Sequence, residues 1–226
     1  MAEASPLSEN NAAAAAYNFP SHYLDVSTDL RRSFRHGPIR VGSPAPDITL
    51  FTLEGEPVDL TELSGGQHLA LVFGSYTAPP CTLHLPALEQ LKSSLEGSGS
   101  RLVFVYTREI HPDEPVPPRG RVVSPHRTLD EKLAAAHLLI DEFSLTMPVL
   151  VDDVIGTVHR AFGALPFQSV VIDRAGIVVF RSEWVDAAQL GVVLANLDDR
   201  QRFAEEDSMR NSYFEGLWGI DAAGWH

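Results

Sequence analysis

The chain has 226 residues, 44% of them hydrophobic and 21% charged, which is enough to bury one sizeable core in a single domain with extended ends. Thirty acidic against seventeen basic residues give a net charge of −13, which disfavours nucleic acids and anionic membranes as partners and leaves small molecules or proteins. A single cysteine excludes an internal disulfide, and the chain shows neither an apolar run near the roughly 20 residues of a membrane span nor a secretory signal, so we predict a cytoplasmic protein.

The chain begins with an N-terminal extension, residues 1–40. Its Ala-, Ser- and Asn-rich start predicts disorder, and the aromatic and basic residues that follow predict a segment that packs on another surface. After residue 41, Leu50 and Val58 lie in two short apolar runs on either side of the turn Glu54-Gly55-Glu56. This pattern predicts an N-terminal β-hairpin.

Strands and helices then alternate along the chain. We expect strands at 68–75, 101–107, 147–153, 169–173 and 176–184, helices at 81–97, 127–143, 154–164 and 186–203, and a long Pro-rich loop at 111–126. A β-α-β half followed by an antiparallel β-β-α half predicts an α/β protein with a mixed sheet of four or five strands, flanked by helices in the thioredoxin-like order. The expected thioredoxin-like domain covers residues 41–200, and residues 201–226 form a C-terminal arm.

The junction between the first long strand and its helix, "LVFGSYTAPPC" at 71–81, has the architecture of a reaction site. A helix N-terminus carries unpaired N–H groups and a partial positive charge, so a thiol placed there ionises easily and becomes a nucleophile. Position 78 is an alanine, which has no lone pair with which to attack a substrate.

Four segments in order resemble the iodothyronine deiodinases: "FGSYTAPPC", "YTREIHPDE", "PHRTLDEKLAAAHLL" and "VLVDDVIGTVHRAFGALPFQSVVI". The first is similar to the family's Phe-Gly-Ser-Cys-Thr-selenocysteine-Pro-Pro-Phe motif, and the resemblance covers about residues 41–195. It implies a thioredoxin fold with a peroxiredoxin-like insertion, and frequently a homodimer.

The resemblance places Ala78 on the selenocysteine, Tyr76 on the neighbouring cysteine or serine, and Cys81 on the Phe after the two prolines. Either Ala78 replaces a natural cysteine or selenocysteine, or the protein works without this nucleophile; both alternatives are open at this point. Cys81 has two interpretations of equal weight. It is a functional thiol on the first helical turn with a lowered pKa, able to form a mixed disulfide with another chain, or it is a small apolar residue facing the core.

Polar residues complete the predicted catalytic site: Thr77, Glu109, His111 and His126. Glu109 and His111 stand two residues apart after a strand end, so they could point together into a site, and the resemblance places both on residues of proton transfer and His126 near the substrate. Histidine suits this role because its ordinary pKa is near 6.5. The simpler interpretations are a helix cap for Thr77 and solvated loop residues for the other three.

Neighbouring residues are assigned to substrate binding: Tyr76, Arg127, Pro166 and Phe167. Pro166 lies within about one residue of the position where thioredoxin folds keep a cis-proline. The remaining helical histidines, His84, His137 and His159, are interpreted as surface or half-buried residues, and no motif for a metal, a phosphate group or another cofactor stands out.

Two functions follow from this pattern. The first is a deiodinase-like or peroxiredoxin-like oxidoreductase that acts on a small halogenated, peroxide or thiol substrate, with a thiol reductant or a partner protein. The second is a non-redox protein of the same fold, either a binding protein or an enzyme that uses Glu109, His111 and His126 as acid and base.

Overall fold

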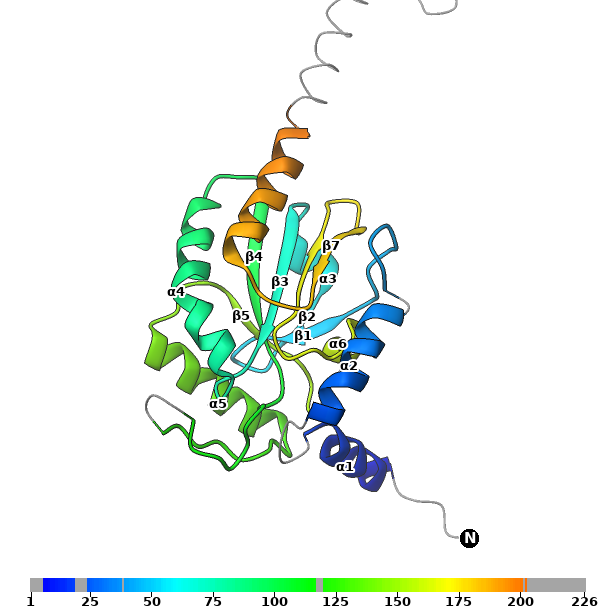
Figure 1. Cartoon of the computed structure of the whole chain (residues 1–226), viewed down its shortest axis with the longest axis vertical. Coiled ribbons are helices and arrows are strands. Elements are labelled where there is room, and N and C mark those ends of the chain that lie inside the picture. Colours follow the sequence, from blue (N-terminus) through cyan, green and yellow to red (C-terminus); the bar gives the residue numbers. More distant parts are fainter. Residues whose placement is uncertain (1–5, 19–23, 38, 117–119, 201, 203–226) are drawn as a thin grey trace, which may run out of the picture.

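The computed structural model describes residues 6–18, 24–37, 39–116, 120–200 and 202. Its centre is a mixed seven-stranded sheet in the order β2-β1-β5-β4-β3-β6-β7 (Figure 1). The strands are β1 (Thr49–Phe51), β2 (Pro57–Asp59), β3 (His68–Gly74), β4 (Ser100–Tyr106), β5 (Val149–Val151), β6 (Ser169–Ile172) and β7 (Val178–Ser182). The helices are α1 (Pro6–Tyr17), α2 (Leu24–His36), α3 (Leu60–Ser64), α4 (Pro79–Ser94), α5 (Leu129–Phe143), α6 (Thr157–Ala161) and a last helix over residues 187–200. The predicted α/β class with a mixed sheet is confirmed.

Strand β3 is an interior strand of the sheet, between β4 and β6, and all seven of its residues are buried. It runs parallel to β4 and antiparallel to β6. Its continuous apolar sequence suits this place, because a strand covered on both faces has no solvent side. The register pairs Gly74 at the end of β3 with Tyr106 at the end of β4, so the loops that follow both strands begin at the same edge of the sheet.

The sheet is wider than the predicted four or five strands. The predicted β-hairpin is present as β1 and β2, which pair antiparallel, but β1 also pairs with β5 through Phe51 and Val151. The hairpin therefore extends the central sheet. A sequence pattern identifies a hairpin by its turn, whereas the strand beside which the hairpin docks is a tertiary contact without a local signal.

The two faces of the sheet carry separate apolar clusters. Ala70 and Val72 of β3 pack with buried residues of α4, α5 and the helix over 187–200. Leu69, Leu71 and Phe73 point the other way and pack with α3 and α6. This alternation is the period-two geometry of a strand, and it produces three layers, with the long helices α4 and α5 together on one side (Figure 1).

Helix α5 begins with a capping box in which the Thr128 hydroxyl accepts from the Glu131 N–H and the Glu131 carboxylate accepts from the Thr128 N–H. The same carboxylate accepts from the Arg127 N–H at 2.6 Å. These bonds fix the start of the helix and the residues just before it. His126, the last residue of the Pro-rich loop, is thereby held at the entry to α5.

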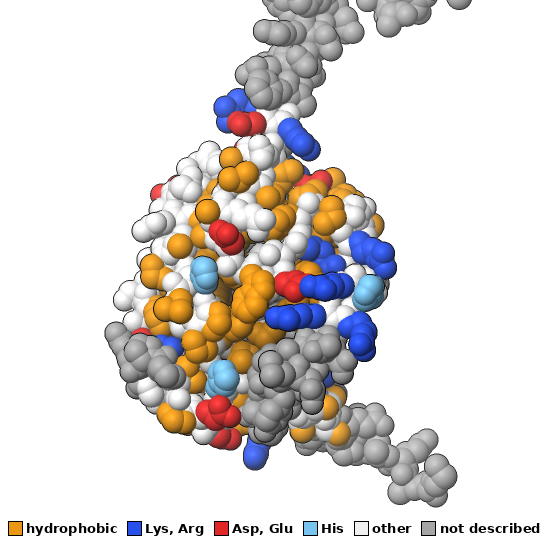
Figure 2. Space-filling model, in the orientation of Figure 1, with side chains coloured by type: hydrophobic (Ala, Val, Ile, Leu, Met, Phe, Trp, Pro, Cys, Tyr) orange, Lys and Arg blue, Asp and Glu red, His pale blue; other side chains and the backbone are white. Residues whose placement is uncertain are grey.

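The N-terminal extension is more regular than predicted. The sequence predicted an irregular start here, but residues 6–17 form helix α1. The helix contains the run Ala12–Ala16, and alanine has the highest helix propensity of all residue types. Helix α2 packs on the domain through Phe34, which is 6% exposed, and the Arg35 side chain donates to Glu183 at 2.6 Å. Figure 2 shows Lys and Arg side chains gathered on the side of the molecule where α2 lies. The predicted C-terminal arm falls almost wholly outside the described residues.

A short segment covers the start of the edge strand β7. The Gly42 N–H donates to the Val178 carbonyl at 2.8 Å, and the Val178 N–H donates to the Ser43 carbonyl at 2.9 Å. The Ala45 N–H adds a bond to the Gly176 carbonyl.

None of the helices in the described ranges has the length and apolar character required to cross a bilayer.

Candidate active site

The carboxylate of Glu109 is the centre of a buried polar cluster at the edge where β3 and β4 end. Its Oε2 accepts two hydrogen bonds from Thr77, one from the backbone N–H at 2.7 Å and one from the hydroxyl at 2.5 Å. Its Oε1 accepts from the Tyr106 hydroxyl. Glu109 is 3% exposed and both donor residues are fully buried. A carboxylate this deeply buried is stable only with such partners.

His126 faces the same carboxylate from the entry to α5. Its Nε2 lies 3.4 Å from the Glu109 Oε1, and both side chains are 1% exposed. Burial raises the pKa of the Glu109 carboxyl, but His126, Thr77 and Tyr106 outweigh this effect and hold the pKa below its usual range. The cluster is therefore an ionised carboxylate in contact with an imidazole.

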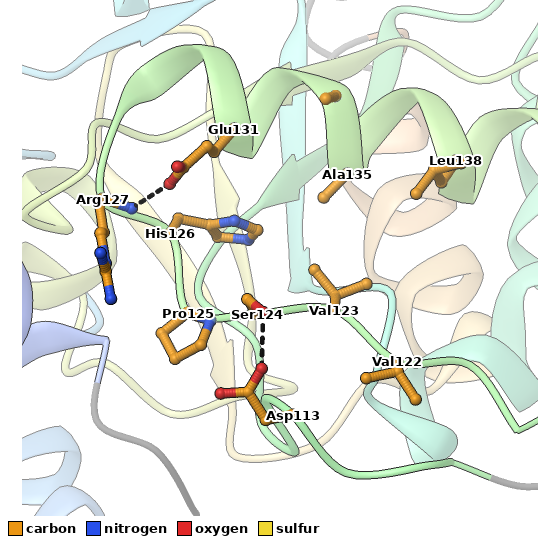
Figure 3. A pocket seen from close by; sticks show the side chains of 11 residues that line it. Asp113, Val122, Val123, Ser124, Pro125, His126, Arg127, Glu131, Ala135 and Leu138 are labelled. Atoms are coloured by element: carbon orange, nitrogen blue, oxygen red, sulfur yellow. Dashed lines mark hydrogen bonds between the residues drawn. The ribbon is translucent and has the colours of Figure 1, made fainter.

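His126, whose side chain is 1% exposed, is one of the residues that line a pocket of about 610 Å³. Figure 3 shows the ring extending into the space between α5 and the segment that carries Val122 and Val123. The walls are mainly apolar, with polar groups near the histidine; the lining residues are Asp113, Val122, Val123, Ser124, Pro125, His126, Arg127, Glu131, Ala134, Ala135 and Leu138. An apolar cavity with a few convergent polar groups is the usual form of a small-molecule site. His126 is the residue that links this pocket to Glu109.

Ala78 occupies the position predicted for a nucleophile, at the N-cap of α4, with Pro79 and Pro80 opening the helix. Its backbone follows Thr77, whose two donors hold Glu109. Its side chain is 0% exposed. The geometry expected for a reactive group is thus present, and the side chain at its focus is an inert methyl group.

Cys81 does not have the lowered pKa expected of a thiol on a first helical turn. It is 1% exposed, and burial raises its pKa to about 12, with a further rise from the charge of Glu109. A Cβ at Gly74 would lie 2.2 Å from its Sγ, so the sulfur fills the space that glycine leaves. Desolvation outweighs the helix dipole here. The structure supports the alternative interpretation, a small apolar residue in the core.

His111 is only partly where the sequence placed it. Its backbone N–H donates to the Thr77 hydroxyl at 3.2 Å, which helps to orient that hydroxyl toward Glu109. Its ring instead points to the surface, where Nδ1 lies 3.1 Å from the Glu114 carboxylate and the side chain is 38% exposed. The expectation that Glu109 and His111 point the same way is wrong, because the chain turns after the strand end and the two-residue alternation no longer applies.

Tyr76 belongs to a second polar group beside the cluster. Its hydroxyl donates to Glu142 Oε2 at 2.5 Å, and the guanidinium of Arg121 donates to Glu142 Oε1 at 2.8 Å and lies 5.2 Å from the Tyr76 ring. Arg121 comes from the Pro-rich loop and Glu142 from the end of α5. These contacts hold the loop against the helix at the pocket side of the domain.

The other predicted substrate residues lie around this region. Arg127 lines the pocket with His126. Pro166 is buried in the turn before β6, and Phe167 packs against the apolar cluster that contains Ala78 while stacking on Trp184 at 5.7 Å. Their roles in substrate binding remain predictions.

Sequence reasoning missed two buried residues at this edge, and each left a signal. Tyr106 follows Phe104 by two residues on one face of β4, which directs its hydroxyl to the side of α4 and α5. Lys132 stands with Ala135, Ala136 and Leu139 at helical spacing, so it occupies a core position. It is 0% exposed, and its ammonium donates to the Asp153 carbonyl at 2.8 Å.

His159 was expected at the surface or half-buried but is fully buried on α6. It stacks on Phe73 at 5.7 Å, so it packs as an aromatic residue against the end of β3. The exposure of His84 and His137 agrees with the prediction. Within the described parts of the chain, no group of three or more His, Cys, Asp and Glu side chains is arranged to hold a metal ion.

Comparisons with known proteins find relatives of this chain. The chain is 30% identical over 140 residues to type I iodothyronine deiodinase of Xenopus laevis, an alignment that covers 61% of this chain and 55% of that protein. It is 33% identical over 134 residues to type II iodothyronine deiodinase of Rattus norvegicus, covering 56% and 50%. The chain thus spans about half the length of the curated relatives it matches.

The fold has solved counterparts. One is a putative protein disulfide isomerase from Bacteroides thetaiotaomicron, with a TM-score of 0.54 and 18% identity over 74% of this chain and 96% of that one. Another is a thiol:disulfide interchange protein of the thioredoxin family from Chlorobium tepidum, with a TM-score of 0.51 and 18% identity over 71% and 99%. These likenesses establish a thioredoxin-like fold. The sequence profile of the iodothyronine deiodinases matches residues 26–186, and the chain therefore belongs to the iodothyronine deiodinase family.

Proposed function

We propose that this protein binds a small halogenated aromatic molecule in the pocket beside His126 and exchanges protons with it through His126 and Glu109. The observation that carries the proposal is the contact of 3.4 Å between a buried carboxylate and a histidine that is also one of the residues lining the pocket. Imidazole is the side chain that most often serves as a general acid or base, and the carboxylate beside it supplies a counter-charge.

Each member of the cluster has a role in this scheme. His126 is the residue placed to meet the bound molecule, while Glu109 is the counter-charge behind it. Thr77 and Tyr106 donate to both carboxylate oxygens and keep Glu109 ionised and fixed in one orientation. The apolar walls of the pocket would exclude water around the ring of the ligand and strengthen these electrostatic interactions.

The acid–base function is favoured over thiol chemistry by the state of the two candidate nucleophile positions. Ala78 carries no reactive atom. Cys81 is the single cysteine of the sequence, and its thiol is buried with a pKa of about 12. A reduction that requires attack by a thiolate of this chain is therefore not part of the proposed activity.

A second candidate, the redox activity of a deiodinase-like oxidoreductase, depends on position 78. The observation in its favour is the place of Ala78 at the N-cap of α4, next to Thr77 and the ionised Glu109. A thiol at this position would lie where the helix dipole favours a thiolate. This candidate requires a cysteine or selenocysteine at position 78.

The acid–base function is tested with 4-iodophenol in D₂O, by following deuterium incorporation into its ring by NMR. The wild-type protein should accelerate this exchange, and Glu109→Gln and His126→Ala should each lower the acceleration by about 10²-fold or more. Glu114→Gln, an exposed carboxylate outside the cluster, is the matched control and should leave the rate unchanged. Absence of both binding and accelerated exchange would reject the proposal.

The redox candidate is tested by Ala78→Cys, with iodide release and peroxide consumption measured in the presence of a dithiol reductant. Ala78→Ser and Cys81→Ser in the same background are the controls. A gain of turnover in Ala78→Cys alone would support it. No gain, together with wild-type exchange that Glu109→Gln abolishes, would leave the acid–base function standing.

A further inference from the structure

Tyr17, the last residue of α1, is inserted into the domain beside Arg108, the residue that precedes Glu109. It is 2% exposed, and its backbone carbonyl accepts from Arg108 Nη1 at 2.9 Å. Its hydroxyl lies 2.7 Å from His159 Nδ1. Since His159 Nε2 lies 2.8 Å from the Leu165 carbonyl, which can only accept, Nε2 carries the hydrogen and Nδ1 accepts from the tyrosine. The site thus offers a hydrogen-bond acceptor, His159 Nδ1, whose partner must be a protonated hydroxyl group.

The Tyr17 ring is surrounded by cations. Arg108, Arg160 and Lys132 lie 5.1, 5.2 and 5.5 Å from its centroid, within the range of cation–π attraction. The His159 ring meets the Tyr17 ring edge-on at 5.9 Å and 83°. A core tyrosine ordinarily packs among apolar side chains, whereas this ring is held by charged and polar groups that recognise a π-face and a hydroxyl.

The shape of the site is fitted to a flat ring. Gly156 has a φ of +74°, and a Cβ on it would lie 2.2 Å from the Tyr17 ring. Position 156 therefore requires glycine for two reasons: its backbone has a positive φ, and the Tyr17 ring leaves no space for a side chain. Burial and the charge of Asp152 raise the pKa of Tyr17 well above its usual value, so the group that the site holds is a neutral phenol.

The residue that fills the site and the residues that build it have different origins. We name the surrounding residues Arg108, Lys132, Gly156, His159 and Arg160 the phenol socket. All five lie inside the segment matched by the deiodinase profile, residues 26–186, whereas Tyr17 and α1 lie before it. The socket thus lies within the segment that matches the family, and its occupant comes from the segment before it.

We propose that the phenol socket is a binding site for neutral phenols, filled in this structure by the chain's own Tyr17, so that a free phenol and α1 compete for it. Tethering gives Tyr17 an effective concentration on the order of millimolar, so a free phenol displaces it only at comparable or higher concentration. Binding of the phenol releases α1 and leaves the Arg108 side chain without the Tyr17 carbonyl as its acceptor.

The test compares the full-length wild-type protein with Tyr17→Phe, using p-cresol as the phenol and amide hydrogen exchange of residues 12–18 as the readout. Tyr17→Phe keeps the ring but loses the bond to His159, which contributes about 1 kcal/mol. Half-maximal release of α1 should therefore need about fivefold less p-cresol in Tyr17→Phe than in the wild type. 4-Methylanisole, which has the same ring without a hydroxyl donor, should need a higher concentration than p-cresol to release α1 in either protein.

Two outcomes would overturn the proposal: unchanged exchange of α1 at saturating p-cresol, or release at the same concentration in both proteins. Binding of p-cresol in the pocket beside His126 is separated by Leu138→Trp, a change at an exposed residue that lines that pocket, which should leave the release of α1 unchanged. Loss of release in Leu138→Trp would assign the effect to the pocket and reject the socket. The result is independent of the proposed acid–base activity, because the readout is the exchange of α1 and not turnover.

Discussion

Two consecutive residues at the end of β4 serve two opposite kinds of buried site. Glu109 is an anion at the centre of neutral donors from Thr77 and Tyr106, whereas Arg108 is one of several cations around the neutral ring of Tyr17. In the first site the charged group, the Glu109 carboxylate, is at the centre. In the second site the centre is the neutral Tyr17 ring, and the charged side chains surround it. The comparison shows how the short segment after β4 supports both sites, since its two consecutive side chains lie on different sides of the chain.

The largest expected effect is on the free energy of unfolding when the central carboxylate of the Glu109 cluster is removed. Replacing Glu109 with leucine leaves the Thr77 and Tyr106 donors buried without an acceptor, so the free energy of unfolding should fall by about 3–5 kcal/mol. Urea denaturation measures this loss, with the exposed Glu114→Leu as the control.

The loss in free energy of unfolding caused by Glu109→Leu should also depend on pH. The folded pKa of Glu109 lies below its unfolded value, so its ionised form stabilises the fold above pH ~4.3 and this contribution is lost as the pH falls through the folded pKa. The difference between wild type and variant should therefore shrink below pH 4. A deficit that stays constant down to pH 3 would contradict the ionised cluster.

The rim of the phenol socket should respond to pH with the same sign but in an alkaline range. Burial lowers the pKa of Lys132 to about 8, so between pH 8 and its unfolded value near 10.5 the unfolded chain binds more protons, and stability rises with pH. Relative to Lys132→Met, the wild type should gain on the order of 3 kcal/mol across this window.

The Cys81 thiol of the unfolded chain also titrates in this range, whereas burial raises its pKa to about 12 in the folded protein, but Cys81 is present in both proteins and its effect cancels in this comparison. Parallel stability curves for wild type and Lys132→Met between pH 8 and 10 would show that the ammonium is not desolvated as the structure describes. A steeper rise in the wild type would sharpen the contrast between the anionic centre and the cationic rim.

Beneath the Glu109 cluster, Cys81 should behave as part of the apolar core. Cys81→Ser buries a hydroxyl in its place and should lower the free energy of unfolding by about 1–2 kcal/mol. Iodoacetamide at pH 8 should label the thiol of the wild type only after denaturation, as followed by mass spectrometry. Rapid labelling of the folded protein would restore the functional interpretation of this residue.

The smallest effect is expected at His111, whose ring lies outside both sites. Its pairing with Glu114 is exposed, so His111→Asn should change the free energy of unfolding by less than about 0.5 kcal/mol. The backbone bond to Thr77 persists in this variant. A loss above 1 kcal/mol in urea denaturation would mean that the ring, and not only the backbone, supports the cluster.

The sequence predicted the elements that position the site because their signals are local. The buried run of β3, the double proline that opens α4 and the capping box before α5 each depend on neighbouring residues. From these elements, Thr77, Glu109 and His126 could be expected at one edge, and they do meet there.

Several failures of prediction involve tertiary packing, for which the sequence has no local signal. The burial of Cys81 against Gly74 and the insertion of Tyr17 beside His159 depend on how the chain packs, and no local spacing specifies them. The docking of the β-hairpin on β5 has the same origin. Lys132 is the instructive exception, because a lysine at a core position of a helical pattern was visible in the sequence and indicated a buried charge.

The two outer strands of the sheet are closed to further pairing in different ways. At β7, the segment Gly42–Ala45 takes up the start of the strand, and at the other end β2 is three residues long and begins with a proline. Unpaired strand edges are the template on which copies of a protein polymerise. Among the described residues neither edge offers a long free ladder, so high concentrations should not drive amyloid-like stacking of the folded domain, and a second copy would have to meet it through side chains rather than by continuing the sheet.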